Sequence, residues 1–119
     1  MNFRYSFVIP VYNRPEEVED LLRSLTQLEE GEPFEVVLVE DGSENTSEAV
    51  VASYKQVLDI QYFLTENQGA GKSRNLGMQK ACGNYFLILD SDCLVPSGYL
   101  TAVHSQLTTL PTDAFGGPD

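Results

Sequence analysis

The sequence is poor in basic residues, and this shortage excludes two classes of partner. Its 119 residues contain 7 Lys and Arg against 18 Asp and Glu, which gives a formal net charge of −11 at pH 7. Nucleic acids and anionic membrane surfaces are bound through basic patches, so we expect neither as a partner. The same charge repels an anionic substrate unless a bound cation or local hydrogen-bond donors reverse the field.

Several other features are scarce. The two cysteines, Cys82 and Cys93, are too few for a zinc cluster, and we expect both to be reduced packing residues. The only histidine, His104, falls in a predicted helix away from the polar motifs, which disfavours a histidine-activated nucleophile. No apolar run reaches the roughly 20 residues of a transmembrane helix. The N-terminal residues lack a signal-peptide profile.

Short apolar runs alternate regularly with amphipathic segments along the chain. Runs rich in Val, Ile, Leu and Phe predict buried strands, and apolar residues three and four positions apart predict helices. The predicted strands cover Tyr5–Val11, Phe34–Val39, Asp59–Leu64 and Tyr85–Leu89. A helix is predicted after each of them, and another strand begins near residue 113. This order predicts an α/β fold with a mostly parallel, Rossmann-like sheet and helices on both faces.

The fourth predicted strand is an unbroken apolar run and is therefore expected to be buried on both faces. The second predicted helix is expected to turn one apolar face inward, formed by Ala49, Val50, Tyr54 and Val57. A chain of 119 residues predicts one domain. Because the chain stops just after a predicted strand, we expect residues 1–119 to be the first part of a longer, truncated domain.

Unusual polar residues gather in four segments, and each segment follows a predicted strand. These segments are Pro10–Arg14, Glu40–Ser43, Asn67–Asn75 and Asp90–Cys93. In a parallel sheet the carboxyl ends of the strands share one edge, where ligands bind. We therefore expect the four segments to converge, although they are far apart in the sequence.

Asp90 and Asp92 are the candidate metal ligands. Oxygen ligands suit Mg²⁺ and Mn²⁺, and a diphosphate would supply further oxygens. Such a cation would also offset the repulsion expected from the net charge. The alternative is that the two acids cap the next helix near Ser97. Their position at the end of a buried strand favours the cation site.

Asp41 follows the second strand and has two interpretations. It forms an Asx turn or helix cap before Gly42, or it accepts N–H bonds from a planar ligand such as a nucleobase. Its neighbour Glu40 is interpreted as a solvent-facing acid. Tyr12, after the first strand, is either a stacking contact for a ligand or a core residue.

The third segment combines a permissive backbone, a helix N-terminus and two cations. Gly69, Gly71, Lys72 and Arg74 supply these features, which together suit phosphate binding. An ordinary junction between loop and helix is the alternative. The spacing is not that of a P-loop, and the first strand-to-helix turn lacks the glycines of a dinucleotide-binding site.

Taken together, the motifs resemble the N-terminal half of a family 2 glycosyltransferase with the GT-A fold. The matching motifs are Val8–Arg14 (VIPVYNR), Val39–Ser43 (VEDGS), Asn67–Gly77 (NQGAGKSRNLG) and Leu89–Asp92 (LDSD). They come in the family's order and spacing, and they cover nearly the whole chain.

The resemblance implies a nucleoside-diphosphate-sugar donor, of the UDP type, and a saccharide or lipid-linked acceptor. It implies an inverting, metal-dependent transfer in which Mg²⁺ or Mn²⁺ neutralises the leaving diphosphate. A role in cell-envelope polysaccharide synthesis and a cytoplasmic location fit this chemistry. The inner face of the membrane is the alternative location for a full-length protein.

The resemblance also implies roles for individual residues. Pro10 and Tyr12 line the nucleobase pocket, and Asp41 accepts a hydrogen bond from the base. Asp90 lies near the ribose or the metal, and Asp92 ligates the metal. The remaining donor-site residues implied by the motifs are Asn13, Gly69, Lys72 and Arg74.

Three residues depart from the family's pattern. Glu40 and Ser73 stand where the family usually has aspartate and alanine, and Cys93 stands where another acid is common. No residue matches the family's general base, which comes from the second half of the domain, so we expect the chain to be inactive alone. Two other classes remain open: a receiver-like module that binds Mg²⁺, and a nucleotidyltransferase. The first lacks the acids it needs after strand one, and the second lacks a basic, glycine-rich first loop.

Overall fold

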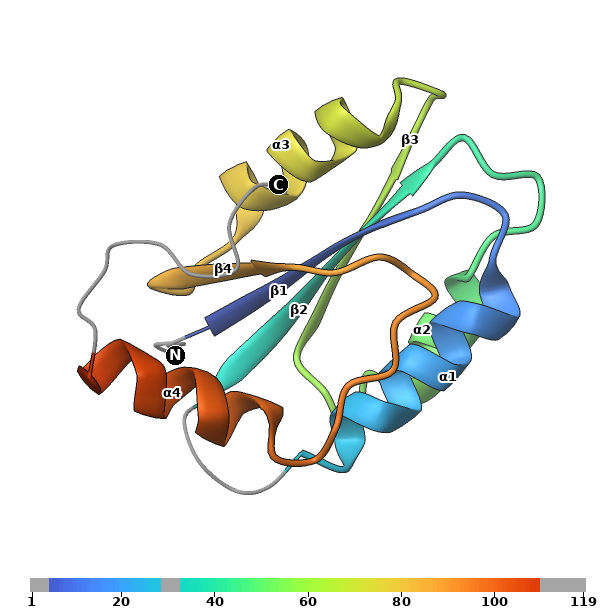
Figure 1. Cartoon of the computed structure of the whole chain (residues 1–119). Coiled ribbons are helices and arrows are strands. Elements are labelled where there is room, and N and C mark those ends of the chain that lie inside the picture. Colours follow the sequence, from blue (N-terminus) through green and yellow to red (C-terminus); the bar gives the residue numbers. More distant parts are fainter. Residues whose placement is uncertain (1–4, 29–32, 110–119) are drawn as a thin grey trace.

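The computed structural model describes residues 5–28 and 33–109, which form a four-stranded parallel sheet flanked by helices (Figure 1). Strands and helices alternate along the chain. In order they are β1 (Tyr5–Val11), α1 (Pro15–Thr26), β2 (Phe34–Asp41), α2 (Glu48–Tyr54), β3 (Ile60–Thr65), α3 (Ala70–Lys80), β4 (Tyr85–Ile88) and α4 (Tyr99–Thr109). The strand order is β3-β2-β1-β4, and every neighbouring pair is parallel. The predicted α/β class is therefore confirmed.

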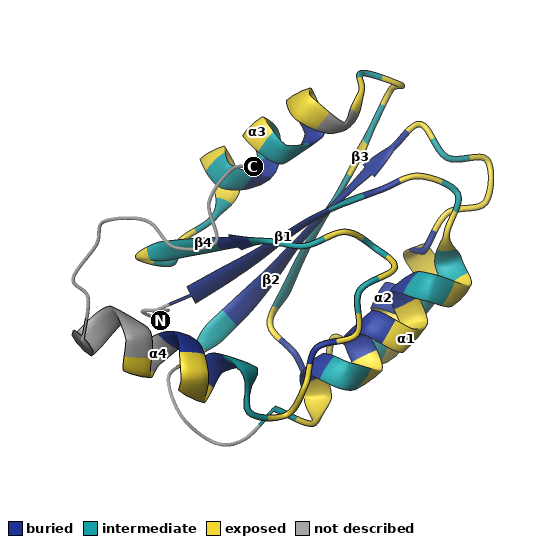
Figure 2. Cartoon of the chain, in the orientation of Figure 1, coloured by how far each residue is buried: buried dark blue, intermediate teal, exposed yellow. Residues whose placement is uncertain are grey.

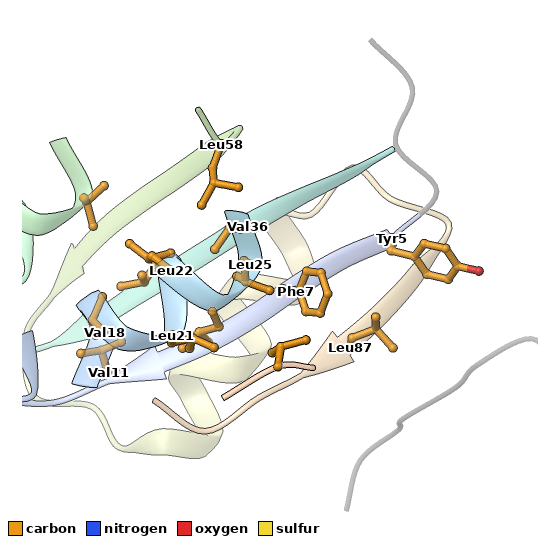
Figure 3. Packing of buried hydrophobic residues seen from close by; sticks show 14 of the residues in the cluster. Tyr5, Phe7, Val11, Val18, Leu21, Leu22, Leu25, Val36, Leu58 and Leu87 are labelled. Atoms are coloured by element: carbon orange, nitrogen blue, oxygen red, sulfur yellow. The ribbon is translucent and has the colours of Figure 1, made fainter. Parts of the chain in front are cut away.

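One face of the sheet is covered by α1, α2 and α4, whose apolar residues join those of the strands in one buried cluster. Figure 3 shows four residues of α1 directed at Phe7, Val11 and Val36 of the sheet. These α1 residues recur three and four positions apart and are Val18, Leu21, Leu22 and Leu25. Replacing one such buried leucine by alanine typically costs about 2–5 kcal/mol.

The helix α1 begins at Pro15, as the sequence predicts. Pro15 occupies a first-turn position, where its missing N–H is tolerated, and Glu16 and Glu17 place negative charge at the positive end of the helix. The start of α1 fixes the length of the connection from β1. That connection is therefore only three residues long, from Tyr12 to Arg14.

The opposite face of the sheet carries α3, which packs against β1 and β2. Figure 1 shows α3 on the side away from α1 and α2. Its close approach depends on Gly77, because a Cβ there would lie 2.5 Å from Cγ1 of Val8. The two central strands are thereby enclosed on both faces, and Figure 2 shows them as the most buried elements.

The structure corrects two predictions about burial. In β4 only Leu87 is fully buried, and Tyr85, Phe86 and Ile88 are half-buried, because β4 pairs with β1 alone in the described part of the chain. In α2, Val50 and Tyr54 pack against the core as predicted, but the fully buried residue is Val51, and Ala49 is exposed.

Val57 is also exposed, because α2 ends at Tyr54 and leaves Val57 in the following turn. Both cysteines are free, as predicted, but Cys82 is exposed and is not a packing residue. The predicted strand near residue 113 lies outside the described residues. Among the helices that the structure describes, none has the length and apolar character needed to cross a membrane.

Candidate functional site

A cavity of about 420 Å³ lies at the edge of the sheet where the strands end. Three of the four predicted segments contribute to its wall: the one after β1, the end of β2 and the one after β4. The lining residues are Pro10, Val11, Tyr12, Arg14, Glu17, Asp41, Asp90, Ser91 and Asp92. The parallel topology therefore brings together polar residues up to 80 positions apart, as the sequence predicts.

The wall of the cavity is strongly acidic. It carries four carboxylates and one guanidinium, that of Arg14, so its formal charge is 1 − 4 = −3. Nε of Arg14 lies 3.6 Å from Oε1 of Glu17, and the Arg14 side chain is largely exposed whereas that of Glu17 is partly exposed. The other three carboxylates come from Asp41, Asp90 and Asp92. An anionic ligand would be repelled here unless a cation entered with it.

Asp90 and Asp92 are both exposed and share a turn in which N–H of Cys93 donates to the carbonyl oxygen of Asp90 (3.1 Å). Within residues 5–28 and 33–109, no hydrogen bond or ion pair engages either carboxylate. The helix α4 instead begins with N–H of Tyr99 donating to the carbonyl oxygen of Pro96 (3.0 Å). The capping interpretation of the two acids therefore has no support in the described structure.

The chemistry of these carboxylates fits a hard cation. Among the described residues, no cluster of three or more His, Cys, Asp or Glu side chains is placed to hold a metal ion. Mg²⁺, however, is usually bound by one or two carboxylates together with substrate phosphates and water. Two unengaged carboxylates on one cavity wall match that pattern, in which the ligand completes the coordination.

Asp41 ends β2 and is almost completely buried, yet it lines the cavity. Its Oδ1 accepts from N–H of Gln68 (2.6 Å), and its Oδ2 accepts from N–H of Gly69 (2.9 Å). The carboxylate thus ties the connection between β3 and α3 to the end of β2. Oδ1 also accepts a long hydrogen bond from the hydroxyl of Thr65 (3.5 Å), so Oδ2, which has a second lone pair, is the oxygen that can still accept from a ligand.

Among its described residues, the predicted segment Asn67–Asn75 does not line the cavity, and it contacts the wall where Gln68 and Gly69 donate to Asp41. Gly69 precedes α3 with φ of +94°, a conformation that favours glycine. Gly71 and Lys72 are exposed, and Arg74 is half-buried. Of the predicted phosphate-binding residues, Gly69 is therefore linked to the cavity wall through Asp41, whereas Gly71, Lys72 and Arg74 are not among the lining residues.

Tyr12 and Asn13 occupy the short connection between β1 and α1. Tyr12 is 52% exposed and lines the cavity. Asn13 does not line it. The Oδ1 atom of Asn13 accepts from N–H of Glu44 (2.8 Å) and of Asn45 (3.0 Å), which joins this connection to the one after β2.

Glu40 is the residue that the sequence interpretation missed. It was expected to face solvent, but it is fully buried. Its carboxylate accepts from the hydroxyl of Ser43, from N–H of Ser47 (2.8 Å) and from the hydroxyl of Tyr62 (2.8 Å). The period-two pattern of β2 contains the signal that would have found it, because Val36 and Leu38 of the same face are core residues.

Burial raises the pKa of the Tyr62 phenol well above 10, and the hydrogen bond to Glu40 and the negative charges of Glu40 and Glu48 raise it further. The phenol therefore stays protonated and donates to Glu40 at all ordinary pH values. This keeps one of the three donors to the buried carboxylate in place.

The family model for glycosyl transferase family 2 matches residues 6–118. The chain belongs to glycosyltransferase family 2. Nothing in the similarities supports the receiver-like module or the nucleotidyltransferase that the sequence left open. The resemblance drawn from the four motifs is therefore confirmed at the level of the family and of the GT-A fold.

Relatives of this family 2 chain include an uncharacterized glycosyltransferase of Rickettsia conorii. It is 35% identical over 112 residues, which is 94% of this chain and 18% of the relative. The chain therefore spans less than a fifth of that relative's length.

Two solved structures share the fold. TarS of Staphylococcus aureus, in complex with UDP-GlcNAc, has a TM-score of 0.81 at 29% identity over 89% of this chain and 31% of that one. A mannosyltransferase of Pyrobaculum calidifontis, in complex with GDP-Man and Mn²⁺, has a TM-score of 0.79 at 23% identity over 90% of this chain and 33% of that one. The second likeness concerns the fold alone.

Proposed function

We propose that this chain is the donor- and metal-binding part of a glycosyltransferase that uses a nucleoside-diphosphate sugar, of the UDP type. One observation carries the proposal: the unengaged carboxylates of Asp90 and Asp92 share a cavity with Tyr12 and Asp41. A nucleotide sugar needs a base pocket and a cationic diphosphate site close together. The wall supplies an aromatic side chain and an acceptor for the base, and two exposed carboxylates for the cation.

In this proposal each wall residue has a distinct role. Pro10 and Tyr12 contact the nucleobase, and Asp41 uses a free lone pair to accept one of its N–H groups. Asp92 ligates Mg²⁺ or Mn²⁺, and Asp90 either shares that metal or binds the ribose. When bound, the metal offsets charge on the diphosphate as the bond to the sugar breaks.

In this proposal, residues outside the cavity wall complete the donor site. Lys72 and Arg74 lie on the first turns of α3, whose N-terminus after Gly69 carries a partial positive charge. Asn13 holds the loop that carries Tyr12. TarS binds UDP-GlcNAc, which supports a nucleotide-sugar donor for this chain, whereas the divalent cation is argued from the carboxylates of Asp90 and Asp92 on the cavity wall.

We further propose that residues 1–119 form the N-terminal portion of a larger catalytic domain. No described residue on the cavity wall matches the acid that activates the acceptor hydroxyl in this family. The transfer is proposed to be inverting, to a saccharide or lipid-linked acceptor of the cell envelope, in the cytoplasm or at the inner face of the membrane. The chain alone is then expected to bind donor without transferring its sugar.

Calorimetry with UDP and Mn²⁺ tests the proposal. UDP should bind at least tenfold more tightly with Mn²⁺ present than with the ion removed by a chelator, because the wall of charge −3 otherwise repels the diphosphate. GDP and ADP, titrated in the same way, test the preference for uridine. Equal affinity for UDP with and without Mn²⁺ would refute the metal-dependent donor site.

A further inference from the structure

Glu40 is fully buried, yet it is only two hydrogen bonds away from the cavity wall. The hydroxyl of Ser43 donates to Oε2 of Glu40. The same hydroxyl oxygen accepts from N–H of Asn13 at 2.8 Å. Asn13 stands between Tyr12 and Arg14, which both line the cavity. A continuous chain of hydrogen bonds thus joins the buried carboxylate to the backbone of the wall.

The backbone at Asn13 needs such an anchor. Its φ of +52° lies in the left-handed region, which costs a non-glycine residue conformational energy. The side chain of Asn13 accepts from the backbone amides of Glu44 and Asn45, and the backbone N–H of Asn13 donates to the hydroxyl of Ser43. The connections after β1 and after β2 are therefore locked together. More than half of the Tyr12 surface is exposed, so packing alone does not fix its position.

The other oxygen of Glu40 is held just as firmly. Oε1 accepts from N–H of Ser47 and from the hydroxyl of Tyr62, both at 2.8 Å. Ser47 precedes α2 and Tyr62 lies in β3, so two elements hold the carboxylate in place. Three donors converge on this group. A carboxylate satisfies them because both of its oxygens are acceptors, whereas an amide that kept its oxygen on Ser47 and Tyr62 would turn N–H₂ toward the Ser43 hydroxyl and so remove the charge-assisted bond that this hydroxyl donates.

We propose that Glu40 is a positioning residue for the donor site. Through Ser43 it fixes the wall from Tyr12 to Arg14, and it thereby strengthens binding of the nucleoside part of a nucleoside diphosphate without touching it. The inference rests on the proposed function. It adds to that function a specific dependence of nucleotide affinity on a buried group outside the cavity.

The same strand supplies a matched control. Glu35 is also buried and also accepts three hydrogen bonds, from the Ser6 hydroxyl (2.7 Å), the Gln61 amide (3.0 Å) and N–H of Cys82 (2.5 Å). It lies at the opposite end of β2, away from the cavity. Glu35→Gln therefore disturbs a network of the same kind without reaching the wall.

The experiment compares Ser43→Ala, Glu40→Gln and Glu35→Gln with the unchanged protein. Calorimetry with Mn²⁺ present measures binding of UDP and of pyrophosphate, and hydrogen exchange follows the amides of residues 12–14 and 44–45. Ser43→Ala and Glu40→Gln should weaken UDP about 3- to 10-fold, the range expected for one lost hydrogen bond, and leave pyrophosphate unchanged. Their amides at 12–14 and 44–45 should exchange faster.

Two further variants keep the test decisive. Glu35→Gln should leave UDP affinity and these amides unchanged, although it lowers stability. Ser43→Thr keeps the hydroxyl and should restore UDP binding, which an altered fold would not do. If Glu40→Gln does not fold, the Ser43 pair carries the comparison.

The outcomes separate the two proposals. If the unchanged protein binds UDP with Mn²⁺ and Ser43→Ala binds it equally well, the positioning role is overturned. Equal losses for UDP and pyrophosphate would also overturn it, because the effect would then not be specific to the nucleoside. If the unchanged protein binds no nucleotide, the proposed function fails, and unchanged exchange at 12–14 in Ser43→Ala would refute the anchor separately.

Discussion

Glu35, where the strands begin, and the pair Asp90 and Asp92, where the strands end, are carboxylates in opposite environments. At the edge where the strands begin, Glu35 is buried, and its oxygens accept from the Ser6 hydroxyl, the Gln61 side-chain amide and N–H of Cys82. At the edge where the strands end, Asp90 and Asp92 are exposed on an acidic wall, and no described residue donates to them. The same functional group thus stabilises the fold at one edge and is left open to a ligand at the other.

The difference follows from the cost of burying charge. A buried carboxylate must be hydrogen-bonded, because an unpaired one is very unfavourable. The bonds that satisfy Glu35 also use up its capacity to bind anything else. Exposed carboxylates keep that capacity, but their mutual repulsion opposes folding. Asp41 lies between these extremes, since it is buried, accepts two amides and still reaches the cavity.

The largest expected effect concerns the edge where the strands end, which carries the exposed Asp90 and Asp92 and is called the open edge below. Asp92→Asn removes one proposed metal ligand and should weaken UDP binding in the presence of Mn²⁺ about 100-fold, or roughly 2.7 kcal/mol. Its thermal unfolding midpoint should not fall, because the substitution removes a repulsive charge from the wall. Calorimetry and a thermal unfolding scan measure the two quantities.

Asp59→Asn is the matched control for that loss. Asp59 is an exposed acid at the edge where the strands begin, immediately before β3. Removing its charge changes the net charge of the protein equally, so it should leave UDP affinity unchanged. A similar loss in both variants would mean that overall charge, and not a ligand at position 92, governs binding.

At the edge where the strands begin, which carries the buried Glu35, a substitution should lower stability and leave UDP affinity unchanged. Glu35→Gln replaces an acceptor oxygen by an N–H₂ group that faces other donors, and it should lower the free energy of unfolding by about 2–3 kcal/mol. UDP affinity should not change. Urea denaturation measures the first quantity. A Glu35→Gln variant with unchanged stability and weakened UDP binding would contradict the claim that Glu35 stabilises the fold without contributing to nucleotide binding.

Much of this comparison is predictable from the sequence, because it depends on local pattern. Mostly apolar runs of five to seven residues predict the strands, which span four to eight residues, and alternation with helices predicts parallel pairing. The position of Asp90 and Asp92 after β4 then follows from topology. The convergence of the segments after β1, β2 and β4 needs no knowledge of side-chain packing.

The parts that escaped prediction depend on contacts between distant residues. The period-two pattern of β2 places Glu40 on a buried face, but it does not show that Tyr62 and Ser47 donate to its carboxylate. The role of Asn13 likewise depends on amides about 30 positions away. Such hydrogen bonds leave no local periodic signal, since the partners come together only when the strands pair.

A Tyr62 variant tests whether the hydrogen bonds to the buried Glu40 stabilise the fold, as those to Glu35 are expected to do. Tyr62→Phe removes one of three donors to Glu40 and should cost about 1–2 kcal/mol of unfolding free energy near pH 7. The native pKa of Tyr62 is raised, so its stabilising contribution is complete below about pH 10, the unfolded value, and declines as the pH rises further.

The stability difference between the unchanged protein and Tyr62→Phe should therefore narrow above pH 10. Urea denaturation at pH 7, 9 and 11 measures it. A difference that grew with pH would show that the phenol ionises more readily in the native state than in the unfolded state, contrary to its burial beside Glu40.

The smallest expected effect is that of replacing Ser73. This variant tests whether an unpaired polar group in α3 takes part in ligand binding. Ser73 is fully buried in α3, and among the described residues its hydroxyl has no hydrogen-bond partner. Ser73→Ala removes this unsatisfied group and should raise the free energy of unfolding by about 1 kcal/mol. Ser53→Ala in α2, whose hydroxyl is exposed and donates to Val50, is the control and should change stability less.

The affinity of the same variant decides what the hydroxyl of Ser73 does. If UDP binds Ser73→Ala as tightly as the unchanged protein, the hydroxyl is a cost to stability with no share in binding, and the open edge is confined to the carboxylates on the cavity wall. If stability rises while UDP affinity falls, the hydroxyl is satisfied by the donor when it binds. The open edge then extends from Asp90 and Asp92 across to α3.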